Sequence, residues 1–291
     1  MARAARRPFV ASPAGSAVLR FRCEVGYDGT GYSGWQTQPH ANTLQDLIEA
    51  RLSSILQHPI LVAASGRTDA GVHARAQVFH FECPRDARFP GLIPSERSLP
   101  RDSHSFHDVA ARAVERAIVG LPENTGLPSA VRVAHVKPAS SSFHARESRI
   151  GVRYTYTVLE GCGCPFTARF RWAIGKRRLN VDRMAAAASA MVGTHDFSAF
   201  AVRNVSDTRT PVKHMRRLEV VRKEGEASIF GAATSHGGDS LVLITAECDR
   251  FLQHMMRYIS GTLVQVGLGR LSVADIASLL CGEKGNGHAI E

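Results

Sequence analysis

The segment Gly66 to His73 brings together side chains that could do chemistry. Residues 65–75 contain one aspartate, one threonine, one serine, one histidine and two arginines. They show no metal-ligand spacing, no phosphate-binding glycine loop and no nucleophile elbow. What remains is a single carboxylate, Asp69, that arginines can keep ionised. Such a carboxylate is suited to covalent attack on an electrophilic carbon.

The same octapeptide also has a purely structural interpretation. Asp69 could close an Asx turn, with Arg67 as its ion-pair partner at the surface. Taken alone, the octapeptide favours this interpretation over catalysis. His73 has no base or metal partner in the surrounding sequence. We therefore expect it to make an orienting hydrogen bond rather than to transfer a proton.

The elements around this segment follow from hydrophobic periodicity. In the first half, the pattern predicts a helix capped by Asn42 or Thr43 and a second helix over 106–119. Strands are predicted at 18–26, 60–64, 76–82, 130–136 and 152–160. The segment 66–73 then lies between two strands, where a rigid scaffold commonly holds functional residues.

The second half repeats this mixture of strands and helices. Asn180 is expected to cap a helix that runs through Val192, and His195-Asp196-Phe197 is expected to form a structural turn. Further elements are predicted as strands at 214–223 and 240–248, a long helix from Phe251 and a last helix from about Ser272. Strict alternation of strand and helix is missing, so the pattern favours an α+β fold over a doubly wound parallel sheet. Two such halves can build one continuous sheet with a cleft across its middle.

Charge and cysteine content limit the class of protein. The formal net charge is +10, from 36 Lys+Arg against 26 Asp+Glu. This excess fits a polyanionic partner, although a basic tail with a solvated surface would give the same number. The 6 cysteines are scattered except for Cys162 and Cys164, so the sequence predicts no zinc site and suggests a reducing compartment. It also contains no apolar run long enough to span a membrane.

Five motifs resemble, in order, those of the TruA-type tRNA pseudouridine synthases. The most specific is GRTDAGVHA at 66–74. The others are YDGTGYSGWQTQP with TLQDLIE at 27–49, SFHARES with RYTYTV at 142–158, GTHDFSAF at 193–200 and FLQHMMRYISGTLVQVG at 251–267. The resemblance covers roughly residues 21–281. It implies a pseudouridine synthase fold, with two ferredoxin-like halves forming one mixed, mainly antiparallel sheet, helices on one side and a central basic cleft.

The resemblance also implies roles for individual residues. Asp69 is similar to the catalytic nucleophile, which attacks either the uracil ring or the ribose anomeric carbon, and no cofactor or metal is required. Arg67 resembles the arginine that helps displace the target nucleotide. Tyr154 resembles the tyrosine that packs on the flipped base and can assist proton removal at C5. Arg257 resembles the arginine that pairs with the carboxylate. Without the family, Tyr154 would be interpreted as a half-buried strand residue and Arg257 as a solvated helix residue.

The substrate implied by the resemblance is tRNA, with uridines in the anticodon stem-loop region as targets and a homodimer as the working form. A stacked uridine must be flipped out before a carboxylate can reach it. Contacts to the RNA backbone can offset that cost. Lys213, within the basic stretch 213–217, and the stretch 176–178 are candidates for such contacts, as are Arg67, His73 and Tyr154 for the base. Each basic stretch could equally be a solvated strand end.

We expect three parts of the chain. Residues 1–17 form a basic arm or an organellar transit segment, because the first 22 residues carry arginines and no acidic residue. Residues 18–145 form the catalytic half, with an insertion at about 84–105, and residues 146–291 form the C-terminal half. That half stops before the last strand of the family. The expected location is cytoplasmic, or a mitochondrion or other organelle if the arm is a transit peptide.

Two rival functions remain open from the sequence. One is a catalytically impaired RNA-binding or ribosome-assembly factor with the same fold, which the missing last strand favours. The other is an aspartate-dependent glycosidase, which would need a second carboxylate that the motif does not supply. Retention of Asp69, Arg67, Tyr154 and Arg257 favours the isomerase.

Overall fold

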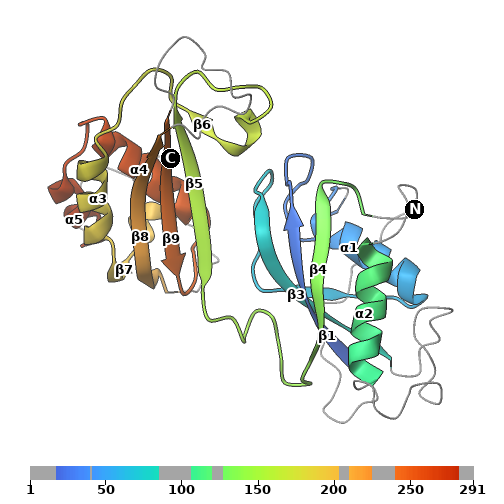
Figure 1. Ribbon diagram of the computed structural model, residues 1–291. Helices are drawn as coiled ribbons and strands as arrows, with labels where there is room; N and C mark the ends of the chain where they lie inside the picture. The colour runs from blue at the N-terminus through green and yellow to red at the C-terminus, as the bar shows by residue number, and fades with distance from the viewer. Residues whose placement is uncertain are drawn as a thin grey trace. The chain divides into compact units, whose positions relative to one another are not determined.

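A computed structural model of the chain describes residues 18–39, 41–84, 106–119, 127–202, 210–224 and 240–281. The expected N-terminal arm, nearly all of the expected insertion and the last ten residues lie outside these ranges. The chain divides into two compact units, Met1–Arg149 and Ile150–Glu291, and each is described by itself (Figure 1).

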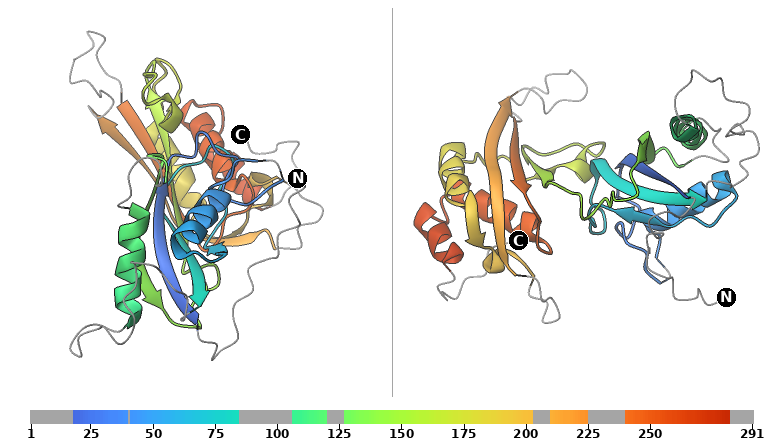
Figure 2. Two further views of the ribbon diagram at one scale, coloured as in Figure 1. Left: turned by 90° about the vertical axis from the view of Figure 1, so that its right-hand side faces the viewer. Right: turned by 90° about the horizontal axis from the view of Figure 1, so that it is seen from below.

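The described residues of the first unit form one antiparallel sheet and two helices. Its elements are β1 (Val18–Tyr27), α1 (Leu44–Leu56), β2 (Val62–Ala64), β3 (Ala74–Pro84), α2 (Phe106–Val119) and β4 (Val131–Ala139). The strand order is β2-β3-β1-β4, with every neighbouring pair antiparallel. Helix α2 lies along β4 and also contacts α1 (Figures 1 and 2).

Alternation along β1 explains why this sheet buries one face. Leu19, Phe21, Cys23, Val25 and Tyr27 follow the two-residue period of a strand, and all are at most 5% exposed. They share one apolar core with residues of α1 and α2. Helix α1 begins where expected, because the Thr43 hydroxyl accepts a hydrogen bond from the Asp46 backbone N–H.

The second unit is also a sheet with helices. Its strands are β5 (Val152–Glu160), β6 (Trp172–Ala173), β7 (Gly193–Asp196), β8 (Val212–Glu224) and β9 (Ser240–Cys248), in the order β6-β5-β9-β8-β7. Its helices are α3 (Val181–Ala190), α4 (Met255–Gly267) and α5 (Val273–Leu280), and α3 contacts both α4 and α5. The short turns η2 (Ala168–Phe170) and η3 (Ser198–Phe200) are 3₁₀-helical.

The predicted cap at Asn180 and the predicted start of the last helix near Ser272 are confirmed. The Asn180 side chain accepts a hydrogen bond from the Arg183 N–H at the start of α3. Ser272 and Asp275 form a reciprocal capping box at the start of α5. Residues of α3, α4, α5 and the sheet share one apolar core.

Three local predictions were wrong in this unit. The segment expected to be a turn at His195–Phe197 begins in β7, where His195 pairs with Lys213 and Asp196 with Val212. That pairing is long-range, so the local sequence does not indicate it. Helix α3 ends at Ala190 rather than Val192, and α4 begins at Met255 rather than Phe251. The α4 start is delayed because His254 adopts left-handed backbone angles, with φ of 58°, which cannot continue a helix.

Within the described residues, no helix has the length and apolar character needed to cross a membrane.

Candidate active site

The motif segment forms the connection between β2 and β3 in the first unit. Asp69 and Arg67 are both exposed at the surface of the chain, whereas Thr68 and His73 are partly buried. The Val72 N–H donates to the Asp69 carbonyl at 3.2 Å and closes a turn over residues 69–72. The local backbone therefore presents Asp69 on a tight turn at the end of two strands.

A second loop, residues 28–35 after β1, lies directly against this turn. The Trp35 N–H donates to the Thr68 carbonyl at 3.0 Å, and the Gly71 N–H donates to the Tyr32 carbonyl at 3.3 Å. The two loops are joined through backbone groups on both sides of Asp69. This arrangement fixes the main chain of the turn through backbone hydrogen bonds on both sides of Asp69.

Two glycines allow this close approach. A Cβ atom added at Gly29 would lie 2.1 Å from the Val72 carbonyl oxygen, and one at Gly34 would lie 2.6 Å from the Thr68 carbonyl oxygen. Gly34 also has a φ of +86°, a conformation that side-chain-bearing residues rarely adopt. The glycine-rich sequence after β1 is thus explained by its packing against the turn at residues 68–72.

Side chains below the turn add to its support. The Tyr27 hydroxyl lies 2.9 Å from the Thr68 hydroxyl, and Trp35 is only 1% exposed. At the entrance to the turn, Gln77 donates to the Gly66 carbonyl at 2.8 Å, and Arg149 donates to the Ser65 carbonyl at 2.6 Å. The motif rests on a packed and hydrogen-bonded base, which favours a defined position for Asp69.

His73 is used within the same pair of loops. Its Nδ1 lies 3.1 Å from the Gly29 backbone nitrogen and 3.0 Å from Asp28 Oδ1. The backbone N–H can only donate, and Asp28 Oδ1 already accepts two hydrogen bonds from Thr30. We therefore assign Nδ1 as the acceptor of the Gly29 N–H. His73 orients the loop that supports the motif.

The second unit carries the other residues expected at the site. Tyr154 lies on β5 opposite Ala246, is partly buried and packs edge-on against Phe251, with ring centroids 4.9 Å apart. Arg257 is exposed in the first turn of α4, and its backbone N–H donates to the His254 carbonyl at 2.9 Å. Phe251, which the sequence did not single out as a site residue, fixes one edge of the tyrosine ring.

Lys213 was predicted to contact the RNA backbone, but its side chain is buried. It is 6% exposed, and its ammonium donates to the backbone carbonyls of Thr210 and Val212. The neighbouring residues Arg216 and Arg217 are exposed. Because Lys213 is buried, the exposed Arg216 and Arg217 are better placed to contact the RNA backbone. A substrate-binding role for Lys213 stays a prediction.

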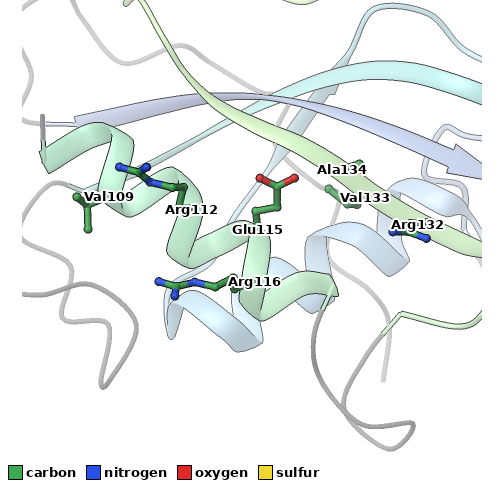
Figure 3. A pocket seen from close by; sticks show the side chains of 7 residues that line it. All are labelled: Val109, Arg112, Glu115, Arg116, Arg132, Val133 and Ala134. Carbon is green, nitrogen blue, oxygen red and sulfur yellow. The ribbon is translucent and has the colours of Figure 1, made fainter. Parts of the chain in front are cut away.

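A hollow of about 460 Å³ lies elsewhere in the first unit, between α2 and β4 (Figure 3). Arginines 112, 116 and 132 line it, together with Glu115, which accepts a hydrogen bond from the His135 backbone N–H at 2.8 Å. None of the residues predicted for the site lines this hollow. No sequence pattern indicates this hollow, because α2 and β4 meet only through the tertiary fold.

The donor groups of the described residues do not form a metal centre. No group of three or more histidine, cysteine, aspartate or glutamate side chains in these ranges is arranged to hold a metal ion. The chemistry available on the motif turn is that of one exposed carboxylate with an arginine two residues before it.

Comparison with known proteins agrees with this arrangement. Residues 25–95 and 187–291 match the family model for tRNA pseudouridine synthase, and these ranges include Asp69 and Arg257. A protein of Polaromonas naphthalenivorans named tRNA pseudouridine synthase A is 34% identical over 251 residues, which cover 86% of this chain and 80% of that protein. Proteins of the same name from Chromobacterium violaceum and Dechloromonas aromatica are 32% and 34% identical, and each alignment covers 90% of this chain and 84% of the relative.

Identity at this level over most of both chains, together with the motif turn on its glycine-supported base, establishes the relationship. The chain belongs to the tRNA pseudouridine synthase family.

Proposed function

We propose that this chain converts uridine to pseudouridine in tRNA, with Asp69 as the nucleophile. The observation that carries the proposal is the placement of Asp69. Its side chain is exposed, while hydrogen bonds to the loop 28–35 hold the backbone on both sides of it. A carboxylate held in a fixed position can attack a bound nucleotide without first being ordered.

The reaction is an isomerisation, so no atoms are gained or lost overall. Asp69 attacks the uracil ring or the ribose anomeric carbon, and the N-glycosidic bond between N1 and that carbon breaks. The uracil rotates and its C5 forms a new bond to the anomeric carbon. The bond to Asp69 breaks so that the free carboxylate is regenerated, and the C5 proton is lost while N1 gains one. These steps need a nucleophile, a group that holds the detached uracil and a proton acceptor for the C5 hydrogen.

We assign the remaining roles from the family resemblance. Arg67, two residues before Asp69, would help displace the target nucleotide. Tyr154 would pack on the detached uracil, and its edge-on contact with Phe251 supports this role because it restricts the ring. Arg257 would pair with the Asp69 carboxylate, and His73 and Lys213 would support substrate binding.

These roles require that the two units together form the central basic cleft. The strand order of the first unit supports ferredoxin-like halves, because β2-β3-β1-β4 with two helices is the arrangement of a βαββαβ fold. The order β5-β9-β8 in the second unit, with α3 and α4, corresponds to the first three strands of the same arrangement. We propose that the two sheets join into one, that the targets lie in the anticodon stem-loop region and that the working form is a homodimer.

The proposal can be tested with tRNA transcripts that carry tritium at C5 of uridine. Pseudouridine formation releases this tritium to solvent, and tRNA binding is measured separately by fluorescence anisotropy. We expect Asp69→Asn to lower turnover by a factor on the order of 10³ or more, as loss of a nucleophile does. Binding should persist, because Asn keeps nearly the same shape.

Asp28→Asn is the matched control. It makes the same chemical change in the adjacent loop, and Asn keeps an oxygen that can accept the hydrogen bonds from Thr30. We expect it to retain most of the wild-type turnover. Equal turnover in wild type and Asp69→Asn would disprove the assignment of the nucleophile. A wild-type chain that binds tRNA but never releases tritium would instead favour the non-catalytic RNA-binding factor.

A further inference from the structure

The segment between β5 and α3, residues 161–178, exposes aromatic side chains. We call it the aromatic loop. Phe166 is 67% exposed, Phe170 46% and Trp172 37%. All three rings lie within seven consecutive residues, a contour length of at most about 20 Å. Exposure of three large rings so close together indicates a binding surface, because single exposed apolar residues are common but clusters are not.

We propose that the aromatic loop binds unpaired nucleotides of the RNA substrate by stacking their bases on its exposed rings. The inference rests on the proposed function for the identity of the RNA, and it adds a contact surface that none of the catalytic roles uses. Base stacking on aromatic side chains is tolerant of sequence, because every base has a π face. Such a surface would select for unstacked regions of the RNA rather than for a particular base.

The charge of the loop fits RNA better than a second copy of this chain. Residues 161–178 contain no aspartate or glutamate, and their basic residues are Arg169, Arg171, Lys176, Arg177 and Arg178. Two such loops facing one another would bring like charges together, which is unfavourable. A polyanion with exposed bases satisfies both the cations and the rings.

Contacts with neighbouring side chains already restrain two of these rings before a base stacks on them. The Arg169 guanidinium lies over the Phe170 ring, 5.3 Å from its centroid. Trp172 meets Tyr156 edge-on, with centroids 6.2 Å apart, and remains partly exposed. Rings that are restrained before binding lose less conformational entropy when a base stacks on them.

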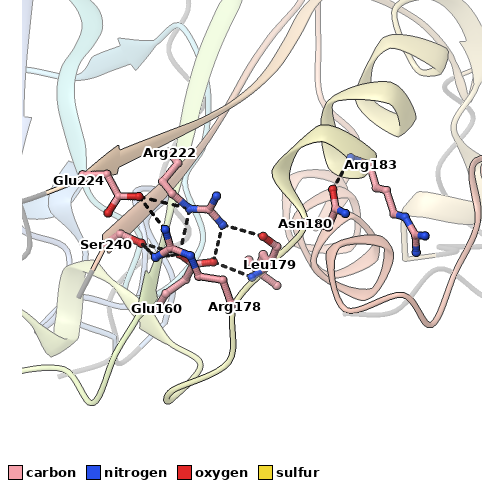
Figure 4. A network of polar contacts seen from close by, with 8 residues as sticks. All are labelled: Glu160, Arg178, Leu179, Asn180, Arg183, Arg222, Glu224 and Ser240. Atoms are coloured by element: carbon pink, nitrogen blue, oxygen red, sulfur yellow. Dashed lines mark hydrogen bonds and ion pairs between the residues drawn. The ribbon is translucent and has the colours of Figure 1, made fainter. Parts of the chain in front are cut away.

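The base of the loop is held by a network around Glu160, the last residue of β5 (Figure 4). Glu160 is 4% exposed and accepts hydrogen bonds from Arg222 at 2.9 and 3.1 Å. It also accepts one from the Leu179 N–H at 2.6 Å and makes an ion pair with Arg178 at 3.2 Å. Residues at the two ends of the loop are thereby tied to each other and to β8.

Strand pairing adds a second restraint. Trp172 and Ala173 pair as β6 with Val158 and Leu159 of β5, and Gly161 bridges Gly175. The exposed rings are therefore carried on a loop that is anchored at its base and along one side. A restrained loop of this kind can present its rings in a defined arrangement.

The test compares three substitutions in the full chain, with a fluorescent full-length tRNA transcript as the probe. Phe170→Leu keeps an apolar side chain but removes the π face, Phe170→Trp keeps the π face, and Val221→Ala is a control at another exposed apolar site, 45% exposed on β8. We expect Phe170→Leu to weaken binding by about 5- to 150-fold, which corresponds to the loss of one stacked base. Phe170→Trp and Val221→Ala should bind as the wild type does.

Salt dependence separates stacking from charge. Phe170→Leu removes no charge, so the slope of log affinity against log salt should stay unchanged. Arg171→Gln should reduce that slope by about 0.7 if the guanidinium contacts one phosphate of unpaired RNA. Trp172 gives an independent optical signal, because the only other tryptophan of the chain, Trp35, is 1% exposed. Transfer RNA should quench wild-type emission, and Trp172→Phe should remove most of that quenching.

Three results would overturn the inference. The first is wild-type affinity in Phe170→Leu, and the second is no tRNA binding by the wild type at all. The third is a change in self-association of Phe170→Leu by sedimentation with unchanged tRNA affinity, which would make the loop a protein contact. Tritium release is recorded in parallel. If Phe170→Leu loses tRNA binding and the wild type releases no tritium, the proposed function is refuted. The aromatic loop would then remain an RNA-binding surface.

Discussion

Gly29 offers a direct test of how the loop after β1 positions the nucleophile. Its Cβ, if present, would lie 2.1 Å from the Val72 carbonyl oxygen and 2.8 Å from the carbonyl carbon. An ordinary carbon-to-oxygen contact is about 3.3 Å, so the Val72 carbonyl would have to retreat by roughly 1.2 Å. The carbonyl oxygen and carbon of Val72 are both backbone atoms, so no flexible side chain can move aside to relieve the contact.

That displacement should reach Asp69. The Val72 N–H closes the turn on the Asp69 carbonyl, at 3.2 Å, so the two residues move as parts of one turn. A misplacement of about 1 Å can lower catalysis by about 100-fold. We therefore expect Gly29→Ala to lower kcat by a factor on the order of 10². The strain of overpacking should cost about 1–3 kcal/mol of unfolding free energy.

Gly31→Ala is the matched control. It makes the same change two residues away in the same loop, where an added Cβ would meet no atom within 4 Å. Turnover is measured by tritium release, tRNA affinity by anisotropy and the folded fraction by urea unfolding. We expect Gly31→Ala to behave as the wild type.

Two outcomes would refute this reasoning. One is equal turnover in Gly29→Ala and Gly31→Ala, which would mean that the turn tolerates the displacement. The other is a loss of turnover in Gly29→Ala that only matches its unfolded fraction. Unchanged tRNA affinity together with a large loss of kcat would support a positioning role.

Two further predictions concern stability against pH, measured by urea unfolding. Burial alone would raise the pKa of Glu160, but hydrogen bonds from Arg222, Ser240 and the Leu179 N–H outweigh it and lower that pKa. Glu160 therefore stabilises the fold above its unfolded pKa of about 4.3, and this contribution is lost as the pH falls through the lower folded value. Glu160→Gln should lower the free energy of unfolding by about 2–3 kcal/mol at pH 7. It should also remove the acid-dependent part of that free energy. The same dependence on pH in the wild type and the variant would contradict this. Burial, together with electrostatic interaction with His144 and Arg20, lowers the pKa of His80 to about 4. As the pH falls, His80 is protonated in the unfolded state near pH 6.5 but in the folded state only near pH 4. The free energy of unfolding should therefore fall by up to about 3 kcal/mol between pH 6.5 and 4. The variant His80→Gln should lack this dependence on pH.

The sequence by itself determined the elements that depend on local signals. The strand 18–26 and the helix at 106–119 were predicted from periodicity, the cap at Asn42 or Thr43 and the cap at Asn180 from residue type, and the start of the last helix near Ser272 from the pattern. These signals act within a few residues, so they are readable without the fold. The motif around Asp69 also stood out, but its residues alone favoured an ordinary turn. Family resemblance, not spacing, gave it a catalytic role.

Only the tertiary structure decided which distant segments meet. The pairing of His195 with Lys213, the approach of Gly29 to Val72 and the anchoring of the aromatic loop by Glu160 each join residues that are far apart in sequence. Burial also depends on such contacts, which is why Lys213 is inside its unit although its neighbours suggest an exposed basic stretch. Periodicity reports which face of an element is apolar, but the partner that covers that face is set by packing over the whole unit.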